Sequence, residues 1–158
     1  MEHVELAGRA STRRDLERRL AGAYYTPSVI AERLAADAVA AGRAPGTVGD
    51  PFCGDGRLVV AWLHAAARAG ALDRLRRIWL RDRDPAAVRA ARTAVTEALG
   101  ALGCGGAVAV TAEAGDTFTE AAALRGRLDV VVTNPPWELL KPDARDGLTG
   151  AAASEHRG

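Results

Sequence analysis

The sequence predicts an α/β protein built on a parallel sheet, and three features indicate it. Short apolar runs of strand length alternate with longer segments whose apolar residues recur at helical spacing. A glycine-rich turn follows the first run, at residues 49–56, and a proline-containing polar turn follows the last run, at residues 133–137. Because ligands bind at the carboxyl ends of the strands in open α/β sheets, both turns are candidate parts of one site.

Composition narrows the class of protein. The 158 residues fit one domain, and with 48% apolar but only 4% aromatic residues its core must consist mostly of Ala, Leu and Val. The net charge of +1 gives no global attraction for nucleic acid, and we interpret the local arginine clusters as solvated helix faces. Two cysteines without a C-x-x-C partner indicate no disulfide framework or zinc site, and no 18-residue apolar run is present. We therefore expect a cytoplasmic protein with no bound metal and no membrane association.

The N-terminal part is predicted to be helical. Residues 1–22 are expected to form an arm and a short capped helix. Thr26 suits an N-cap and Pro27 suits the first helical position, which predicts a second helix that continues to Gly42. The apolar residues of this helix at helical spacing are Ile30, Leu34 and Ala38. Two adjacent tyrosines at its entrance, Tyr24 and Tyr25, suit either a hydrophobic staple or a ligand contact.

The glycine-rich turn joins a strand to a helix. An apolar run at residues 46–48 precedes it. The apolar residues that follow at helical spacing are Leu58, Val59, Trp62, Leu63 and Ala66. Gly54 and Gly56 lack a Cβ, so the backbone can take positive φ and a ligand can approach the N–H groups of the helix start. Since the turn matches neither G-x-G-x-x-G nor G-x-x-x-x-G-K-[ST], a dinucleotide or a triphosphate is disfavoured as the ligand.

A second strand, at residues 77–81, ends in an acid. Asp82 occupies the position that accepts hydrogen bonds from ribose hydroxyls in nucleotide-binding sheets, although a surface carboxylate that balances neighbouring arginines is the alternative. Asp84 is predicted as the N-cap and Pro85 as the first residue of the next helix. One face of that helix carries Val88, Ala91 and Val95.

Two further strands are predicted. Residues 107–111 lead to Asp116, again an acid just after a strand, and residues 128–132 form an apolar run that should be buried on both faces. The prolines in the turn at 133–137 cannot continue a β-ladder, so the chain must leave the sheet there, with the amide of Asn134 at the ligand edge.

Taken in order, these segments resemble the amino DNA methyltransferases that modify adenine at N6. The segments that carry the resemblance are Tyr24-Tyr25-Thr26-Pro27, Asp50-Pro51-Phe52-Cys53-Gly54-Asp55-Gly56, Asp82, Asp116 and Asn134-Pro135-Pro136-Trp137. The resemblance covers residues 22–137 and implies part of a class I methyltransferase Rossmann-like sheet, with about four parallel strands and helices on both faces. It also implies S-adenosylmethionine as the cofactor, DNA as the substrate and a place among restriction-modification enzymes.

The resemblance assigns roles residue by residue. The cofactor-binding residues it implies are Tyr24, Tyr25, Thr26, Pro27, Asp50, Pro51, Phe52, Cys53, Gly54, Gly56, Asp82, Asp116, Thr117, Phe118 and Asn134. The catalytic residues it implies are Asn134, Pro135, Pro136 and Trp137. In this chemistry the target base is rotated out of the duplex and the protein provides orientation without a metal.

Two departures from the family pattern matter. Asp55 stands where the family more often has Ser or Thr, which places an extra negative charge beside the cofactor turn. Only 21 residues follow Trp137, so we expect an incomplete cofactor-binding domain at residues 23–140 and a flexible tail at 141–158. The fourth strand would then be an exposed sheet edge, covered by a second copy or a partner subunit, and DNA would be engaged only with a complementing chain or domain.

Three functions of different class remain open from the sequence. The first is methyl transfer to N6 of adenine in DNA by a truncated or split enzyme. The second is a module that binds S-adenosylmethionine or another protein without catalysis of its own. The third is N-methyl transfer to protein glutamine or to RNA, because the Asn-Pro-Pro-aromatic motif is shared with such enzymes.

Overall fold

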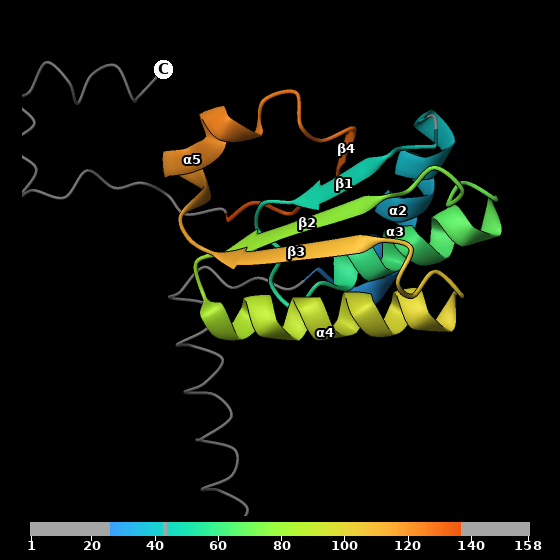
Figure 1. The fold of residues 1–158 in the computed structure, drawn as a ribbon, viewed down its shortest axis with the longest axis horizontal. Coiled ribbons are helices and arrows are strands. Elements are labelled where there is room, and N and C mark those ends of the chain that lie inside the picture. The colour runs from blue at the N-terminus through green and yellow to red at the C-terminus, as the bar shows by residue number, and fades with distance from the viewer. Residues whose placement is uncertain (1–25, 43, 137–158) are drawn as a thin grey trace, which may run out of the picture.

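A four-stranded, all-parallel sheet in the order β3-β2-β1-β4 forms the centre of the protein (Figure 1). The structure is a computed structural model that describes residues 26–42 and 44–136. Its strands are β1 (Thr47–Asp50), β2 (Arg77–Asp82), β3 (Ala109–Ala114) and β4 (Val130–Val131). Its helices are α2 (Ser28–Ala41), α3 (Arg57–Arg68), α4 (Pro85–Ala101) and α5 (Thr117–Leu124). The predicted α/β fold with a Rossmann-like parallel sheet is confirmed.

The strand order creates a switch point beside β1. The chain moves outward from β1 to β2 and β3, and then returns to the other side of β1 to form β4. The connections that leave β1 and β4 therefore start at neighbouring strand ends. In open α/β sheets this is where ligands bind, so the topology alone selects one edge of the sheet for the site.

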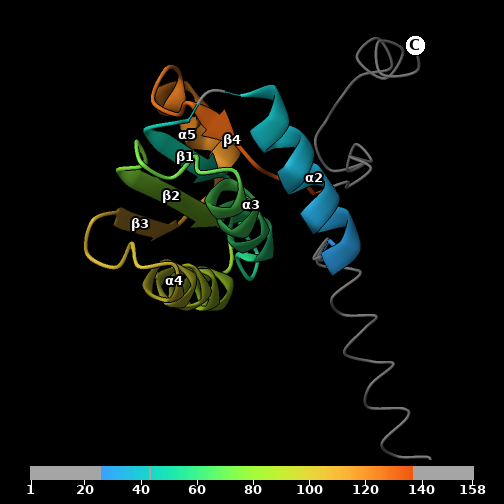
Figure 2. The same ribbon diagram turned by 90° about the vertical axis from the view of Figure 1, so that its right-hand side faces the viewer.

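The core lies between one face of the sheet and helices α3 and α4, with α2 packed outside α3 (Figure 2). All five α3 residues predicted at helical spacing are buried, and so are the three predicted in α4. The predicted cap of α4 is confirmed, because Asp84 Oδ1 accepts a hydrogen bond from the Ala86 N–H at 2.8 Å and Pro85 opens the helix.

The start and the buried face of α2 differ from the sequence prediction. Pro27 is the residue before the helix and no side chain caps it, so Thr26 is not an N-cap. Ile30 and Leu34 are 50% and 46% exposed, whereas the buried residues of α2 are Ala31 and Ala35. The reason is the packing partner. Helix α2 lies against α3 rather than on the sheet, and small side chains allow two helices to approach closely.

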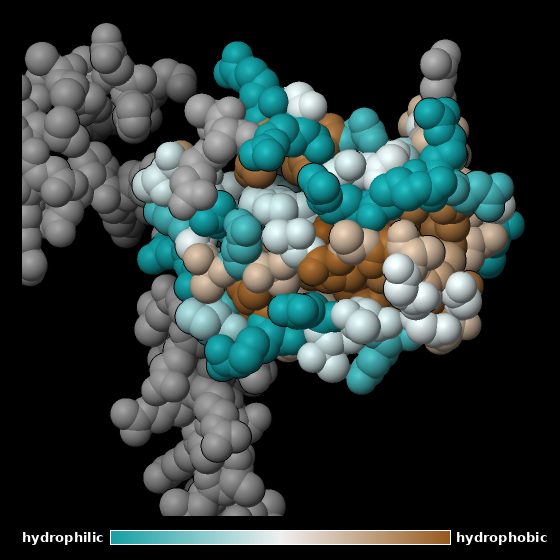
Figure 3. Space-filling view, in the orientation of Figure 1, coloured by the Kyte–Doolittle hydropathy of each residue, from teal (hydrophilic) through white to brown (hydrophobic). Residues whose placement is uncertain are grey.

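Strand β4 also corrects a prediction. Its residue Val131 is 51% exposed, so the fourth strand is not buried on both faces. Burial of the second face requires an element that covers it, and none of the described residues does so at Val131. Strand β3 begins two residues later than predicted and continues to Ala114, and α5 was not predicted. Figure 3 shows apolar surface over β3, the other edge strand, between hydrophilic residues.

Gly56 fixes how closely α3 approaches α4. Its φ of 82° lies in the left-handed region, and a Cβ built on it would be 2.8 Å from the Ala91 Cα. Gly54 has a φ of 50°, so the positive φ predicted for both glycines of the turn is confirmed.

Among the described residues, no helix combines the length and the apolar character needed to cross a membrane.

We predict that Gly56→Ala destabilises the fold more than Gly70→Ala. Both glycines have positive φ, so both variants should lose about 1 kcal/mol from backbone strain. Gly70 has open space around it, whereas Gly56 faces Ala91, so Gly56→Ala should cost about 2 kcal/mol more through overpacking. Urea denaturation of the two variants measures the difference. Equal losses would show that the contact with Ala91 does not constrain the turn.

Candidate cofactor and active site

Asp50, the last residue of β1, is a buried acid. Asp50 is 1% exposed, and its Oδ1 accepts a hydrogen bond from the Phe52 N–H at 3.0 Å. Burial raises the pKa of Asp50 from 3.8 to about 7, while the Thr133 hydroxyl and the Phe52 N–H offset part of that effect and the charge of Asp82 adds to it. Although Thr133 lies near enough to influence the pKa, Asp50 Oδ2 and Thr133 Oγ1 are both buried without a hydrogen-bond partner of good geometry among the described residues. Asp50 and Thr133 therefore form a buried polar pair at the carboxyl end of β1.

Asp82 ties the end of β2 to the glycine-rich turn. Its Oδ2 accepts a hydrogen bond from the Gly54 N–H at 2.9 Å, and its Oδ1 accepts one from the Asp84 N–H at 3.0 Å. The Cys53 N–H also donates to the Arg81 carbonyl at 2.8 Å. Since a carboxylate oxygen has two lone pairs, Asp82 retains capacity to accept from a ligand while it holds both turns.

Asp55 does not add uncompensated charge to the turn. The Arg57 guanidinium lies against both of its carboxylate oxygens, at 2.6 Å for Nη2 to Oδ2 and 3.0 Å for Nε to Oδ1. Nη1 of the same arginine donates to the Thr26 carbonyl at 3.1 Å. The departure from Ser or Thr at this position is therefore accompanied by a cation that also attaches the segment before α2 to the turn.

Thr26 and Asn134 meet across 108 residues of sequence. Asn134 Nδ2 donates to Thr26 Oγ1 at 3.2 Å, and Thr26 is 8% exposed. Thr26 thus receives two contacts from the site, one on its side chain and one on its carbonyl, instead of capping a helix. Thr133 immediately precedes Asn134, and its hydroxyl lowers the pKa of Asp50. These contacts bring Thr26, the glycine-rich turn and the Asn-Pro-Pro segment into one place.

The start of α5 closes another side of the turn. The buried Thr117 hydroxyl donates to the Pro51 carbonyl, and the Phe118 ring lies 5.3 Å from the Phe52 ring, centroid to centroid. Phe118 is 70% exposed, so the pair presents aromatic surface beside the turn. Asp116 is exposed and accepts from the Phe118 N–H at 2.9 Å, which orients the first turn of α5.

Cys53 has a structural environment. It is 5% exposed, and burial, together with the charges of Asp50 and Asp82, raises the pKa of its thiol to about 12. A thiol with such a pKa is a poor nucleophile. Among residues 26–42 and 44–136, no group of three or more His, Cys, Asp or Glu side chains is placed to hold a metal ion.

The predicted site residues divide into three groups. Those joined by the contacts above are Thr26, Asp50, Pro51, Phe52, Cys53, Gly54, Asp82, Thr117, Phe118 and Asn134. Those described at the same strand ends or turns whose side chains make no such contact are Pro27, Gly56, Pro135 and Pro136, whereas the Asp116 side chain contacts only the first turn of α5. Those outside the described residues are Tyr24, Tyr25 and Trp137. Sequence reasoning missed Arg57 and Thr133, and only Arg57 had a signal, its position two residues after the unusual Asp55.

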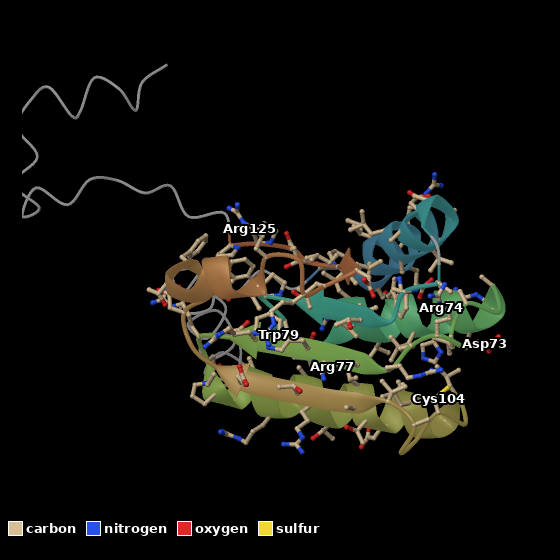
Figure 4. The ribbon with its side chains drawn as sticks, turned by 45° about the horizontal axis from the view of Figure 1, so that its top comes forward. Asp73, Arg74, Arg77, Trp79, Cys104 and Arg125 are labelled. Atoms are coloured by element: carbon tan, nitrogen blue, oxygen red, sulfur yellow. The ribbon has the colours of Figure 1, made fainter. Side chains whose placement is uncertain are left out.

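We predict that stability falls as pH rises from about 4 to about 7, because of Asp50. In this window the unfolded chain has released the Asp50 proton and the folded chain still holds it, so the folded state is progressively disfavoured. Asp50→Asn replaces the carboxyl group by an amide that does not titrate, so it should flatten the dependence of stability on pH in this window. Asp73→Asn, an exposed change before β2 at the amino ends of the strands, should not (Figure 4). Urea midpoints at pH 4.5 and pH 8 give the comparison, and a wild-type slope retained in Asp50→Asn would contradict the assignment.

Comparison with known families identifies the family of the chain. A family model described as N-6 DNA Methylase matches residues 14–146. No curated protein matches the chain at a significant level. The family match spans most of the 158 residues and includes the whole described sheet and both turns. The chain therefore belongs to the N-6 DNA methylase family.

Proposed function

We propose that this chain provides the S-adenosylmethionine-binding and catalytic part of an enzyme that methylates the N6 amino group of adenine in DNA. One observation carries the proposal. The strand order places the turn after β1 and the Asn134 segment after β4 at neighbouring strand ends, on either side of the switch point. Membership of the N-6 DNA methylase family supports methyl transfer to DNA as the reaction class.

The strand-end residues fit S-adenosylmethionine in their chemistry. Asp82, which already accepts from two backbone N–H groups, would accept from the ribose hydroxyls. The buried Asp50 oxygen without a hydrogen-bond partner among the described residues matches a cofactor that carries an ammonium group. The aromatic surface of Phe52 and Phe118 suits a purine ring. When bound, this cofactor supplies the methyl group as an electrophilic carbon.

The role proposed for Asn134 follows from the electronics of adenine. The lone pair of the exocyclic nitrogen is delocalised into the ring, which makes the nitrogen a poor nucleophile. Acceptors that pull on its two N–H bonds localise that lone pair, and we assign this role to Asn134 Oδ1 and the Pro135 carbonyl. The contact from Asn134 Nδ2 to Thr26 would hold the amide in one orientation. Catalysis then comes from positioning and from a site with little water.

DNA must be engaged in a way that releases the base from its stack. We assign Trp137 the role of stacking on the flipped adenine, since an aromatic side chain after a rigid turn suits that contact. A net charge of +1 gives the chain little overall attraction for phosphates. We therefore propose that most of the affinity for DNA comes from a complementing chain or domain, which would also cover the edge of β4, beside which no further described strand lies.

The test is transfer of tritiated methyl groups to adenine-containing duplex and single-stranded DNA, by the chain alone and with a candidate complementing chain. We expect N6-methyladenine as the product, chiefly in the complemented reaction. Asn134→Ala should reduce incorporation at least 100-fold while cofactor affinity stays within about threefold, because the amide acts on the base. Thr93→Ala, an exposed change on α4, is the control.

The alternatives give different results in the same assay. Cofactor binding without incorporation in either arm would favour a binding module. Label found on protein glutamine or on RNA would favour the other N-methyl transfer reactions. Incorporation into adenine that survives Asn134→Ala would contradict the proposed mechanism.

A further inference from the structure

The sheet has a second face that the described helices cover only in part. Helices α3 and α4 lie on one face, and on the other the described chain supplies only the end of α5 and its connection to β4 (Figure 4). There the structure contains a hollow of about 210 Å³. We define the open sheet face by six residues that line it: Arg77, Trp79, Thr111, Leu124, Arg127 and Leu128.

The centre of the open sheet face is apolar. Strand register places Gly49, Trp79 and Thr111 in one row across β1, β2 and β3. The Leu128 side chain packs over Gly49 so closely that a Cβ there would lie 2.6 Å from it. The same row continues to Val131 of β4, which is half exposed. Apolar groups therefore extend along the row from β4 to β2.

The rim of the open sheet face is positively charged. Arg81 and Glu113, which also line the hollow, are register partners with opposite charges, so together they add no net charge to the rim. Arg77 and Arg127 are exposed, and neither side chain makes a hydrogen bond or an ion pair with another described residue. Two cations therefore flank an apolar strip, with no acid among the described residues assigned to either.

The apolar strip and the two flanking cations limit the class of molecule that can bind the open sheet face. Parallel sheets are normally covered on both faces, so a polypeptide is the expected partner. A second copy in a symmetric face-to-face arrangement would bring like charges at Arg77 and Arg127 together. A single-stranded nucleic acid would stack its bases on exposed aromatic side chains, and Trp79 is only 9% exposed.

We propose that the open sheet face is a docking surface for an acidic amphipathic helix of another polypeptide. Its apolar stripe would cover the strip formed by Leu124, Leu128 and the edge of Trp79. Its carboxylates would pair with Arg77 and Arg127 at the rim. The surface lies on the face of the sheet, apart from the strand ends that form the cofactor site, so it serves assembly rather than methyl transfer.

Two labelled 18-residue peptides test the proposal. Both carry Leu at helical spacing, and the remaining positions are Glu and Ala in one peptide and Lys and Ala in the other. Fluorescence anisotropy with the full chain should show at least tenfold tighter binding of the Glu peptide. The double variant Arg77→Glu/Arg127→Glu should reverse this preference. Arg89→Glu/Arg92→Glu makes the same change of charge on exposed positions of α4 and should preserve it.

Each other outcome overturns the proposal. Absence of Glu-peptide binding would exclude the surface, and equal loss in both double variants would show an effect of net charge alone. If duplex DNA binds to the chain through Arg77 and Arg127 and displaces the peptide, the face belongs to a nucleic acid. Circular dichroism of all variants confirms that each is folded.

Discussion

The Asp82 carboxylate holds the ends of two strands in one arrangement, and the site depends on it. One oxygen receives the Gly54 N–H from the turn after β1, and the other receives the Asp84 N–H from the turn after β2. A charged acceptor makes hydrogen bonds roughly twice as strong as a neutral one. The glycine-rich turn is therefore positioned by the residue that we assign to the ribose, so ligand binding and turn geometry are coupled through a single side chain.

A second set of contacts attaches the segment before α2 to the same turn. Arg57 pairs with Asp55 and reaches the Thr26 carbonyl, while Asn134 reaches the Thr26 hydroxyl. Thr26 consequently links the glycine-rich turn to the segment that carries the proposed catalytic amide. The Asp55–Arg57 pair is partly exposed, so its contribution to stability is small, and its value lies in orientation.

Local sequence signals predicted the elements whose determinants are local. The Asp84-Pro85 pair starts α4 as expected because a cap and a fixed φ act within one turn. Thr26 and the buried face of α2 were predicted wrongly because long-range partners, Asn134 and α3, decide them. The apolar run of β4 could not reveal that Val131 is half exposed, since burial depends on what covers the face of the sheet.

The central claim is that the strand ends tied by Asp82 form the cofactor site, and calorimetry with S-adenosylhomocysteine tests it most directly. Asp82→Ala should weaken binding roughly 10- to 100-fold, because it removes a charged acceptor and releases the Gly54 turn. Asp84→Ala removes a carboxylate two residues away. It should cost about 1 kcal/mol of stability through loss of the α4 cap but leave affinity within about twofold. Folded wild-type chain that gives no binding heat, or equal affinity losses in the two variants, would contradict the account.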